Sequence, residues 1–311
     1  MIKVVFDKDN NKEKAENSVV TIGTFDGVHL GHKTIIKKLK QKAKKLNCKS
    51  VVVTFLPHPR NVINNESKVF LLTTLEEKKD LINELGIDKL FVINFTKEFA
   101  QKSYQEFIEK IIFKNNNAKH VIIGYDHKFG KNREGNKTSL LQLAKKNNVG
   151  ITIVEPQKIN NIIISSTKIR NALLQGNTEL ANSMLGRNYK ICGSVIKGSK
   201  RGRTLGFPTA NIQVDEKNKL LPKNGVYLVK VLLQNQKHFG VLNIGVRPTF
   251  NNRTKPIAEV YILEFNNNIY GEKICVEFIK RLRDEKKFQT KEKLIEQIKN
   301  DIAKVKQILN N

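Results

Sequence analysis

Residues 23–32 read Gly-Thr-Phe-Asp-Gly-Val-His-Leu-Gly-His and lie between a predicted strand and a predicted helix. Residues 18–23 (SVVTIG) are apolar and end in glycine, which is typical of a buried strand and turn. Residues 32–46 carry apolar side chains at helical spacing, with lysines opposite. A glycine-rich turn that enters a helix N-terminus favours anion binding, and His29 and His32 can face one phosphate. The alternative is an ordinary glycine turn with two surface histidines.

Strand and helix signals alternate through the first half of the chain. We expect strands at 18–23, 50–55, 89–95, 120–124 and 151–155, and helices at 32–46, 75–85, 103–113 and 140–147. This alternation predicts a parallel sheet covered by helices on both faces. We therefore expect a Rossmann-like α/β domain over residues 1–184.

The pattern changes after residue 185, where short β-rich segments follow one another. They lie at 191–196, 225–233, 238–244, 258–265 and 273–280. A final helix is expected after Thr290, its predicted N-cap, with apolar residues at 294, 295, 298, 302, 305 and 308. The second domain, residues 185–311, is thus expected to be an antiparallel sheet or small barrel with a terminal helix.

The composition excludes several classes of protein. The net charge is +27, yet 46 of the 56 basic residues are lysine and both halves are basic, so we favour a solvated surface over a nucleic-acid-binding protein. No apolar run is long enough to span a bilayer, and no signal-peptide core is present. Cys48, Cys192 and Cys275 show no metal pattern and no disulfide framework, so we expect a cytoplasmic protein without disulfides.

Four segments of the first half resemble the prokaryotic bifunctional riboflavin kinase/FAD synthetase (FMN adenylyltransferase) family. They are GTFDGVHLGH at 23–32, TFLPHP at 54–59, GYDHKFGKNREG at 124–135 and ISSTKIR at 164–170. The resemblance implies an HxGH nucleotidyltransferase domain in which His29 and His32 stabilise charge on the α-phosphate of ATP. It implies ATP contacts from Gly23, Phe25, Asp26, Gly27, Gly31, Ser165, Ser166, Thr167 and Arg170, and flavin contacts from His58, Asp126, Phe129 and Arg133.

Segments of the second half resemble the riboflavin kinase part of the same family. They are GSKRGRTLGFPTAN at 198–211, NIGVRPTF at 243–250, AEVYILEF at 258–265 and LRDEKKF at 282–288. The resemblance implies a small antiparallel β-barrel with a terminal helix, with Glu259 as general base. It implies ATP contacts from Gly198, Gly202, Arg203, Gly206, Pro208, Thr209 and Asn211, flavin contacts from Asn243 and Arg283, and Mg²⁺ ligands at Thr209 and Asn211.

By this resemblance, the second domain converts ATP and riboflavin to FMN and ADP, and the first converts ATP and FMN to FAD and pyrophosphate. The implied partners are riboflavin, FMN, FAD and ATP with Mg²⁺. We expect no nucleic-acid or membrane partner, and a weak homo-oligomer is left open.

Three positions depart from the family pattern. His127 stands where the family usually has Phe, Tyr261 where it has His, and Glu264 where it commonly has Asp. The alternative function is therefore a chain that retains only one activity. A metal pair formed by His58 and His127 is a weaker alternative, because no third ligand lies at suitable spacing.

Overall fold

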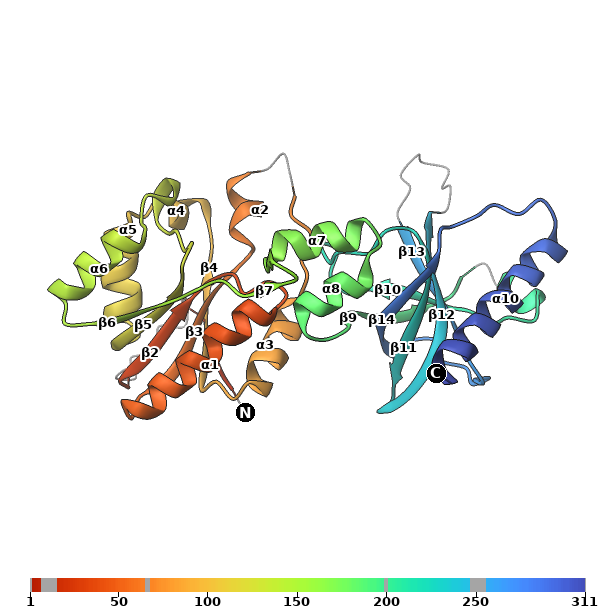
Figure 1. The fold of residues 1–311 in the computed structure, drawn as a ribbon, viewed down its shortest axis with the longest axis horizontal. Coiled ribbons are helices and arrows are strands. Elements are labelled where there is room, and N and C mark those ends of the chain that lie inside the picture. Colours follow the sequence, from red (N-terminus) through yellow and green to blue (C-terminus); the bar gives the residue numbers. More distant parts are fainter. Residues whose placement is uncertain (1, 7–15, 65–67, 199–200, 247–255, 311) are drawn as a thin grey trace. The chain divides into compact units, whose positions relative to one another are not determined.

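The computed structural model describes residues 2–6, 16–64, 68–198, 201–246 and 256–310 (Figure 1). The side chains of residues 201, 203 and 246 are outside this description. Contacts within the chain divide it into two compact units, residues 1–166 and 167–311. Each unit has its own set of buried apolar residues.

The first unit contains a six-stranded sheet in which every strand is parallel to its neighbours. Its strands are β1 (Lys3–Phe6), β2 (Ser18–Ile22), β3 (Lys49–Leu56), β4 (Lys89–Asn94), β5 (Ala118–Gly124) and β6 (Gly150–Val154), in the order β1-β4-β3-β2-β5-β6. The predicted parallel sheet is confirmed. The sequence reasoning missed β1, a four-residue edge strand too short to show a clear period.

Helices cover both faces of this sheet (Figure 1). They are α1 (Leu30–Lys45), α2 (Pro59–Ile63), α3 (Leu75–Glu84), α4 (Lys97–Ala100), α5 (Tyr104–Glu106), the π-helical η1 (Phe107–Lys114), the 3₁₀ turn η2 (Lys131–Arg133) and α6 (Lys137–Lys146). Val20 and Val51 pack with η1 and α6, whereas their neighbours Val19 and Val52 pack with α1 and α3. A short hairpin, β7 (Lys158–Ile159) and β8 (Ile162–Ile163), completes the unit.

The second unit is built around a closed antiparallel barrel with the strand order β10-β13-β12-β11-β14-β9. Its elements are α7 (Ser166–Leu174), α8 (Thr178–Leu185), β9 (Tyr189–Ile196), α9 (Arg201–Thr204), β10 (Ala210–Val214), β11 (Gly225–Leu233), β12 (Gln236–Val246), β13 (Pro256–Ile262), β14 (Lys273–Arg283) and α10 (Lys291–Asn310). Of the two architectures left open by periodicity, the barrel is observed. The sequence reasoning missed β10, a five-residue strand that directly follows the glycine-rich segment.

The cysteine prediction is wrong for one pair. Cys192 and Cys275 form a disulfide, although 83 residues separate them in sequence. They are direct register partners on the adjacent antiparallel strands β9 and β14, with their Cα atoms 4.1 Å apart. Sequence spacing carries no information about such a long-range register, so the pairing could not be inferred before the barrel was known. Cys48 is a free thiol.

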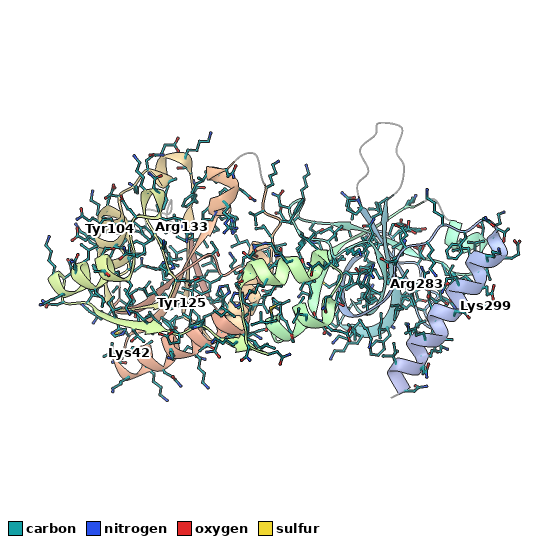
Figure 2. All side chains as sticks on the ribbon, turned by 45° about the horizontal axis from the view of Figure 1, so that its top comes forward. Lys42, Tyr104, Tyr125, Arg133, Arg283 and Lys299 are labelled. Carbon is teal, nitrogen blue, oxygen red and sulfur yellow. A yellow bond between two sulfur atoms is a disulfide. The ribbon has the colours of Figure 1, made fainter. Side chains whose placement is uncertain are left out.

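The terminal helix α10 is attached to the barrel by a partly buried ion pair. Arg283, at the end of β14, lies beside this helix in Figure 2, and its Nε and Nη2 donate to the carboxylate of Asp301 at 2.7–3.1 Å. Gln297 Nε2 donates to the same carboxylate at 3.0 Å. The hydroxyl of Thr290 accepts from the N–H of Lys293, which confirms the predicted N-cap.

Removing the Asp301 carboxylate should destabilise the second unit. The Asp301 side chain is 6% exposed and that of Arg283 is 18% exposed, so Asp301→Ala leaves a guanidinium partly buried and unpaired. We expect the free energy of unfolding to fall by about 3 kcal/mol. Urea denaturation measures the change. The exposed pair of Lys306 and Glu264 is the control, because Lys306→Ala should cost less than about 1 kcal/mol; equal losses would contradict the assignment.

Candidate functional sites

The loop after β2 has an unusual backbone conformation. Phe25, Gly27 and Val28 have φ angles of 46°, 85° and 39°, and the two non-glycine residues are 1% and 0% exposed. The N–H of Gly23 donates to the carbonyl of Val53 at 3.0 Å, which ties the start of the loop to the middle of the neighbouring strand β3. Non-glycine residues with such angles concentrate at functional sites, where the surrounding structure holds them.

Both predicted histidines lie at the N-terminus of α1. His29 is the N-cap, and its Nδ1 accepts the N–H of His32 at 3.3 Å. The two imidazoles are stacked with their ring centroids 3.6 Å apart. A Cβ at Gly31 would lie 3.2 Å from the His29 ring, so glycine keeps the backbone close to it. The structure therefore brings both histidines to one helix terminus, where anions are favoured.

Asp26 of the same loop ties neighbouring segments together. It is 1% exposed, and its carboxylate accepts hydrogen bonds from the backbone N–H groups of Leu72 and Thr73 at 3.0–3.1 Å. The hydroxyl of Ser166 donates to the Asp26 carbonyl at 2.9 Å. These contacts give Asp26 a structural role, and its predicted contact with ATP stays a prediction.

A small pocket adjoins this loop on its Asp26 side. Its lining residues are Asp26, Phe55, Leu56, His58, Leu71, Thr73, Leu75 and Lys78. His58, a predicted flavin contact, caps α2 through a 3.2 Å hydrogen bond from the N–H of Arg60. The pocket is thus formed by the first loop, the carboxyl end of β3 with His58 after it, and the start of α3 with the segment before it. Sequence reasoning missed Lys78, because a lysine in a helix with many charges gave no signal.

The other predicted flavin contacts have different environments. Asp126 and Arg133 are exposed, whereas Phe129 is 6% exposed and belongs to the core cluster on the η1 side of the sheet. The ring of His127 stacks on Phe129 with their centroids 5.7 Å apart. Figure 2 shows Tyr104 and Arg133 in this part of the first unit. Phe129 therefore packs mainly against protein, and its contact with flavin stays a prediction.

Burial keeps His127 neutral near pH 7. Its Nε2 is buried with no hydrogen-bond partner among the described residues, and burial lowers its pKa to about 4, with Asp126 opposing and Arg133 adding to the effect. An unfolded histidine has a pKa of about 6.5, so between these values the unfolded chain binds more protons. The folded state consequently loses stability as the pH falls from about 6.5 towards about 4.

The variant His127→Phe should remove this pH dependence. Between about pH 7 and about pH 5, we expect the wild-type chain to lose about 2 kcal/mol more unfolding free energy than the variant. The phenyl ring retains the stacking on Phe129. Urea denaturation at both pH values provides the measurement, and parallel losses in the two proteins would show that His127 is not the titrating group.

The remaining predicted ATP contacts of this domain surround the start of α7. Ser165 and Ser166 are half-buried, and both belong to the first unit. Thr167 is exposed and Arg170 is half-buried, and both belong to the second unit, which begins at residue 167. Whether these four residues surround one ATP molecule stays a prediction.

In the barrel, three predicted residues lie opposite one another on adjacent strands. Asn211 of β10 and Asn243 of β12 are both register partners of Glu259 on β13. The neighbours Ala258 and Val260 point into the barrel core, so these three polar residues share the outer face of the barrel. Direct partners have Cα atoms about 4.5–5.5 Å apart, which brings the carboxylate and both carboxamides into one cluster.

The glycine-rich segment lies against Asn211 of this cluster. A Cβ at Gly198 would collide with the carboxamide of Asn211, and one at Gly202 would collide with the carbonyl of Phe207. Gly206 has a φ angle of +83°, which requires glycine. Thr209, which is half-buried, lies near Gly202, whereas Pro208 is exposed. The side chain of Arg203, a predicted ATP contact, lies outside the described residues.

Glu285 and Arg283 have contacts that the sequence analysis did not predict. The Glu285 carboxylate occupies the space that a Cβ at Gly245 would need and lies close to Asn243, a proximity that sequence reasoning missed. Arg283 holds Asp301, as described above, and its Nη1 donates to the Asp284 carbonyl at 2.9 Å. Its guanidinium is thus engaged by protein, and its predicted flavin contact stays a prediction.

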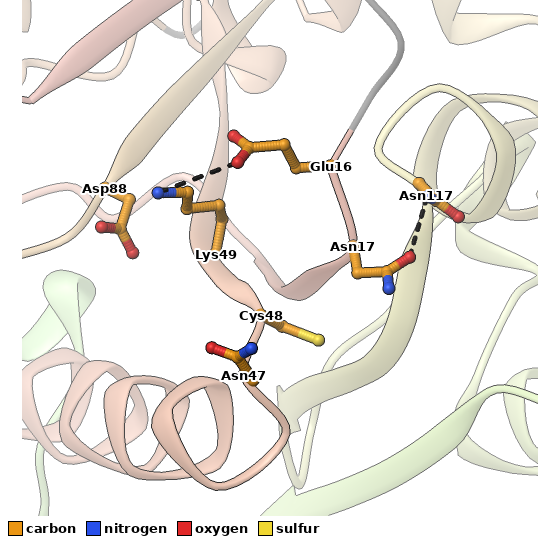
Figure 3. A pocket seen from close by; sticks show the side chains of 7 residues that line it. All are labelled: Glu16, Asn17, Asn47, Cys48, Lys49, Asp88 and Asn117. Carbon is orange, nitrogen blue, oxygen red and sulfur yellow. Dashed lines mark hydrogen bonds and ion pairs between the residues drawn. The ribbon is translucent and has the colours of Figure 1, made fainter.

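A second hollow lies at the opposite, amino edge of the first unit's sheet (Figure 3). Its lining residues are Glu16, Asn17, Asn47, Cys48, Lys49, Asp88 and Asn117. The Asp88 carboxylate already accepts from the N–H and hydroxyl of Ser50. Ligands of parallel α/β sheets bind beyond the carboxyl ends of the strands, so this hollow is not the expected site.

Two sequence families match this chain, one over each half. Residues 11–168 match the sequence family described as FAD synthetase, and residues 185–309 match that described as riboflavin kinase. A bifunctional riboflavin kinase/FMN adenylyltransferase of Listeria monocytogenes is 42% identical over 92% of this chain and 90% of its own, and that of Bacillus subtilis is 41% identical over 93% and 92%. The chain belongs to the bifunctional riboflavin kinase/FMN adenylyltransferase family.

One solved structure is similar over almost the whole chain. It is the crystal structure of a protein called macrolide-efflux protein, from Streptococcus pneumoniae, with a TM-score of 0.89 and 32% identity over 98% of this chain and 99% of that chain. Among the described residues of the present chain, no helix combines the length and apolar character that crossing a membrane requires.

Proposed function

We propose that this chain makes FAD from riboflavin in two steps. The barrel phosphorylates riboflavin with ATP, and the α/β unit then transfers AMP from a second ATP to the FMN. The observation that supports this most strongly is that one chain carries both a histidine pair at a helix N-terminus and a Glu–Asn cluster beside a glycine-rich segment. Relatives with this combination of activities in their names match over nearly the full chain.

In the adenylyl transfer, an oxygen of the FMN phosphate attacks the α-phosphorus of ATP. The bond from that phosphorus to the bridging oxygen breaks, and pyrophosphate leaves with the electron pair. The imidazoles of His29 and His32 and the N-terminus of α1 stabilise the negative charge that develops on the α-phosphate. The substrate supplies the nucleophile, so we expect no covalent enzyme intermediate.

In the kinase step, the riboflavin 5′-hydroxyl attacks the γ-phosphorus of ATP, and ADP leaves. Glu259 accepts the hydroxyl proton as the new bond forms. Asn211 and Asn243, on the strands either side of Glu259, orient the substrates around its carboxylate. The loop from Gly198 supplies backbone N–H groups to the phosphates.

The donors beside Glu259 fit a magnesium ion. Mg²⁺ prefers oxygen ligands, and the Thr209 hydroxyl and Asn211 carboxamide supply them. Asn211 is 6% exposed and lies close beside Gly198, so its side chain is held in place. A Mg²⁺ ion bound with ATP would neutralise charge on the phosphates.

The departures from the family pattern are compatible with both activities. Tyr261 packs edge-on against Phe207 of the glycine-rich loop, with their ring centroids 5.7 Å apart, and so supports the loop. His127, stacked on Phe129, is neutral near pH 7 and replaces an aromatic ring by another. The cytoplasmic location, the weak homo-oligomer and the lack of a nucleic-acid partner stay predictions. The cytoplasmic location was argued in part from the absence of disulfides, and the Cys192–Cys275 disulfide removes that argument.

The proposed function is tested by incubating the purified chain with riboflavin, ATP and Mg²⁺ and separating the flavins over time. We expect FMN to appear first and FAD to follow. Accumulation of FMN without FAD would contradict the transferase step. Unchanged riboflavin, together with conversion of added FMN to FAD, would contradict the kinase step.

A further inference from the structure

Lys78 is a buried lysine beside the loop that follows β2. It lies near the start of α3 and is 7% exposed, although lysine is rarely buried without partners. Its Nζ donates to the Thr24 carbonyl at 2.7 Å and to the Thr54 hydroxyl at 3.1 Å. Burial lowers its pKa to about 8, with the Asp26 carboxylate opposing this effect, so the group is an ammonium at pH 7. Because a buried ammonium costs free energy that an apolar side chain would not, its presence here points to a function.

The ammonium belongs to a set of hydrogen bonds that holds the loop at three of its residues. The Thr54 hydroxyl donates to the Thr24 carbonyl at 3.1 Å, so this carbonyl accepts from both the hydroxyl and the ammonium. The Thr73 hydroxyl accepts from the N–H of Gly27 at 3.0 Å and donates to the Asp26 carboxylate at 3.2 Å. Strand β3, helix α3 and the segment before α3 therefore all bind the loop.

The loop depends on these bonds because part of its backbone is strained. Phe25, which lies between the held residues Thr24 and Asp26, has a φ angle of 46°, and Val28 has one of 39°. Non-glycine residues keep such angles only where the surrounding structure holds them. Losing one of the two donors to the Thr24 carbonyl should therefore let the backbone at Phe25 relax towards an ordinary conformation.

Phe25 connects the held backbone to the histidine pair. Its ring packs edge-on against the His32 imidazole, with the ring centroids 5.0 Å apart, and His32 in turn stacks on His29. Phe25 directly follows Thr24, whose carbonyl binds Lys78. One hydrogen bond, one residue step and one ring contact thus link the ammonium to His32, so a relaxed loop would move the surface against which this imidazole packs.

We propose that Lys78 is a positioning residue for the adenylyl transfer, its ammonium holding the loop so that His32 faces the α-phosphate of ATP. The inference rests on the proposed function. In this role Lys78 acts through the loop and touches neither substrate. A displacement of about 1 Å at a site that stabilises the transition state can slow a reaction about 100-fold. Loss of the ammonium should therefore lower kcat and leave both KM values nearly unchanged.

The variant Lys78→Met tests this inference, because methionine nearly matches the lysine stem but lacks the charge and the donors. We expect kcat for FAD formation from added FMN to fall about tenfold to 100-fold, while the KM values for FMN and ATP change less than about threefold. Cooperative urea unfolding of the first unit shows that the variant is folded. A folded variant with kcat within threefold of wild type, or with a raised KM and unchanged kcat, would overturn the inference.

Lys79→Met is the matched control. Lys79 is the next residue of α3, its side chain is 38% exposed, and it pairs with Glu76 on the same helix. We expect its kcat to stay near that of the wild type. An equal loss in both variants would show that the effect comes from removing any lysine of α3 and would also overturn the inference.

A double variant separates positioning from an independent role of Lys78. If the ammonium acts through His32, its loss matters little once that imidazole is gone. The kcat of Lys78→Met combined with His32→Ala should therefore lie within about threefold of that of His32→Ala alone. Losses that multiply would mean that the two residues act independently, against the proposal.

Thr54→Val decides the question if Lys78→Met does not fold. Valine keeps the side-chain shape and removes the hydroxyl that donates to the Thr24 carbonyl and accepts from Nζ. We expect kcat for FAD formation to fall several-fold with both KM values unchanged, and a normal kcat in this variant would then overturn the inference. If wild-type protein makes no FAD from FMN, the proposed function itself fails.

Discussion

His32→Ala should slow FMN adenylylation about 100-fold to 1,000-fold and leave riboflavin phosphorylation at its wild-type rate. The imidazole stands at the N-terminus of α1, stacked on His29 and in edge contact with Phe25. Its loss removes a donor to the charge that develops on the α-phosphate, which affects kcat more than the KM for ATP. His32 is preferred to His29 for this test because His29 also caps the helix, so its removal would disturb the fold.

The measurement is the rate of FAD formation from added FMN and MgATP. The kinase activity of the same preparation is the control, since the barrel has its own core and a misfolded first unit would show as a lower yield of intact protein. Adenylylation within threefold of wild type would exclude His32 from charge stabilisation. Loss of both activities together would indicate general damage to the chain.

Glu259→Gln should lower riboflavin phosphorylation about 100-fold to 10,000-fold with FMN adenylylation unchanged. The substitution keeps the side-chain shape and removes the proton acceptor between Asn211 and Asn243. Because the carboxylate acts on the substrate hydroxyl, the effect should fall on kcat, with little change in riboflavin binding.

Glu277→Gln is the matched control for this variant. Glu277 is also a half-buried strand carboxylate of the barrel, but it pairs with Lys230 at 3.0 Å on strands away from the Glu259 cluster. We expect its kinase activity to stay near wild type. Normal phosphorylation by Glu259→Gln, or equal loss in both variants, would remove Glu259 from the role of base.

Local sequence patterns predicted the first unit well because its strands are continuous apolar runs. A strand such as β3, which is buried on both faces, is a continuous apolar run and can be recognised from its local sequence alone. The barrel was harder, since closure depends on pairings between distant segments. β10 and the Cys192–Cys275 disulfide both follow from register on β9, and no local pattern encodes that register.

The candidate sites were predicted to the extent that their residues belong to contiguous motifs. His29 and His32 belong to one contiguous motif, and the structure places their rings together. Lys78 and Glu285 reach their sites from other elements, so only the fold could reveal them. Asp26 and Arg283 belong to matching motifs and were predicted to contact ligands. In the structure, their polar groups instead form hydrogen bonds with other residues of the protein.

The central claim is that one chain holds two independent active sites, and a complementation assay tests it most directly. Riboflavin and MgATP are supplied to His32→Ala alone, to Glu259→Gln alone and to an equal mixture, and the flavins are separated. We predict that the first stops at FMN, the second leaves riboflavin unchanged, and the mixture forms FAD at a substantial rate. A mixture that makes no more FAD than the single variants would contradict the account.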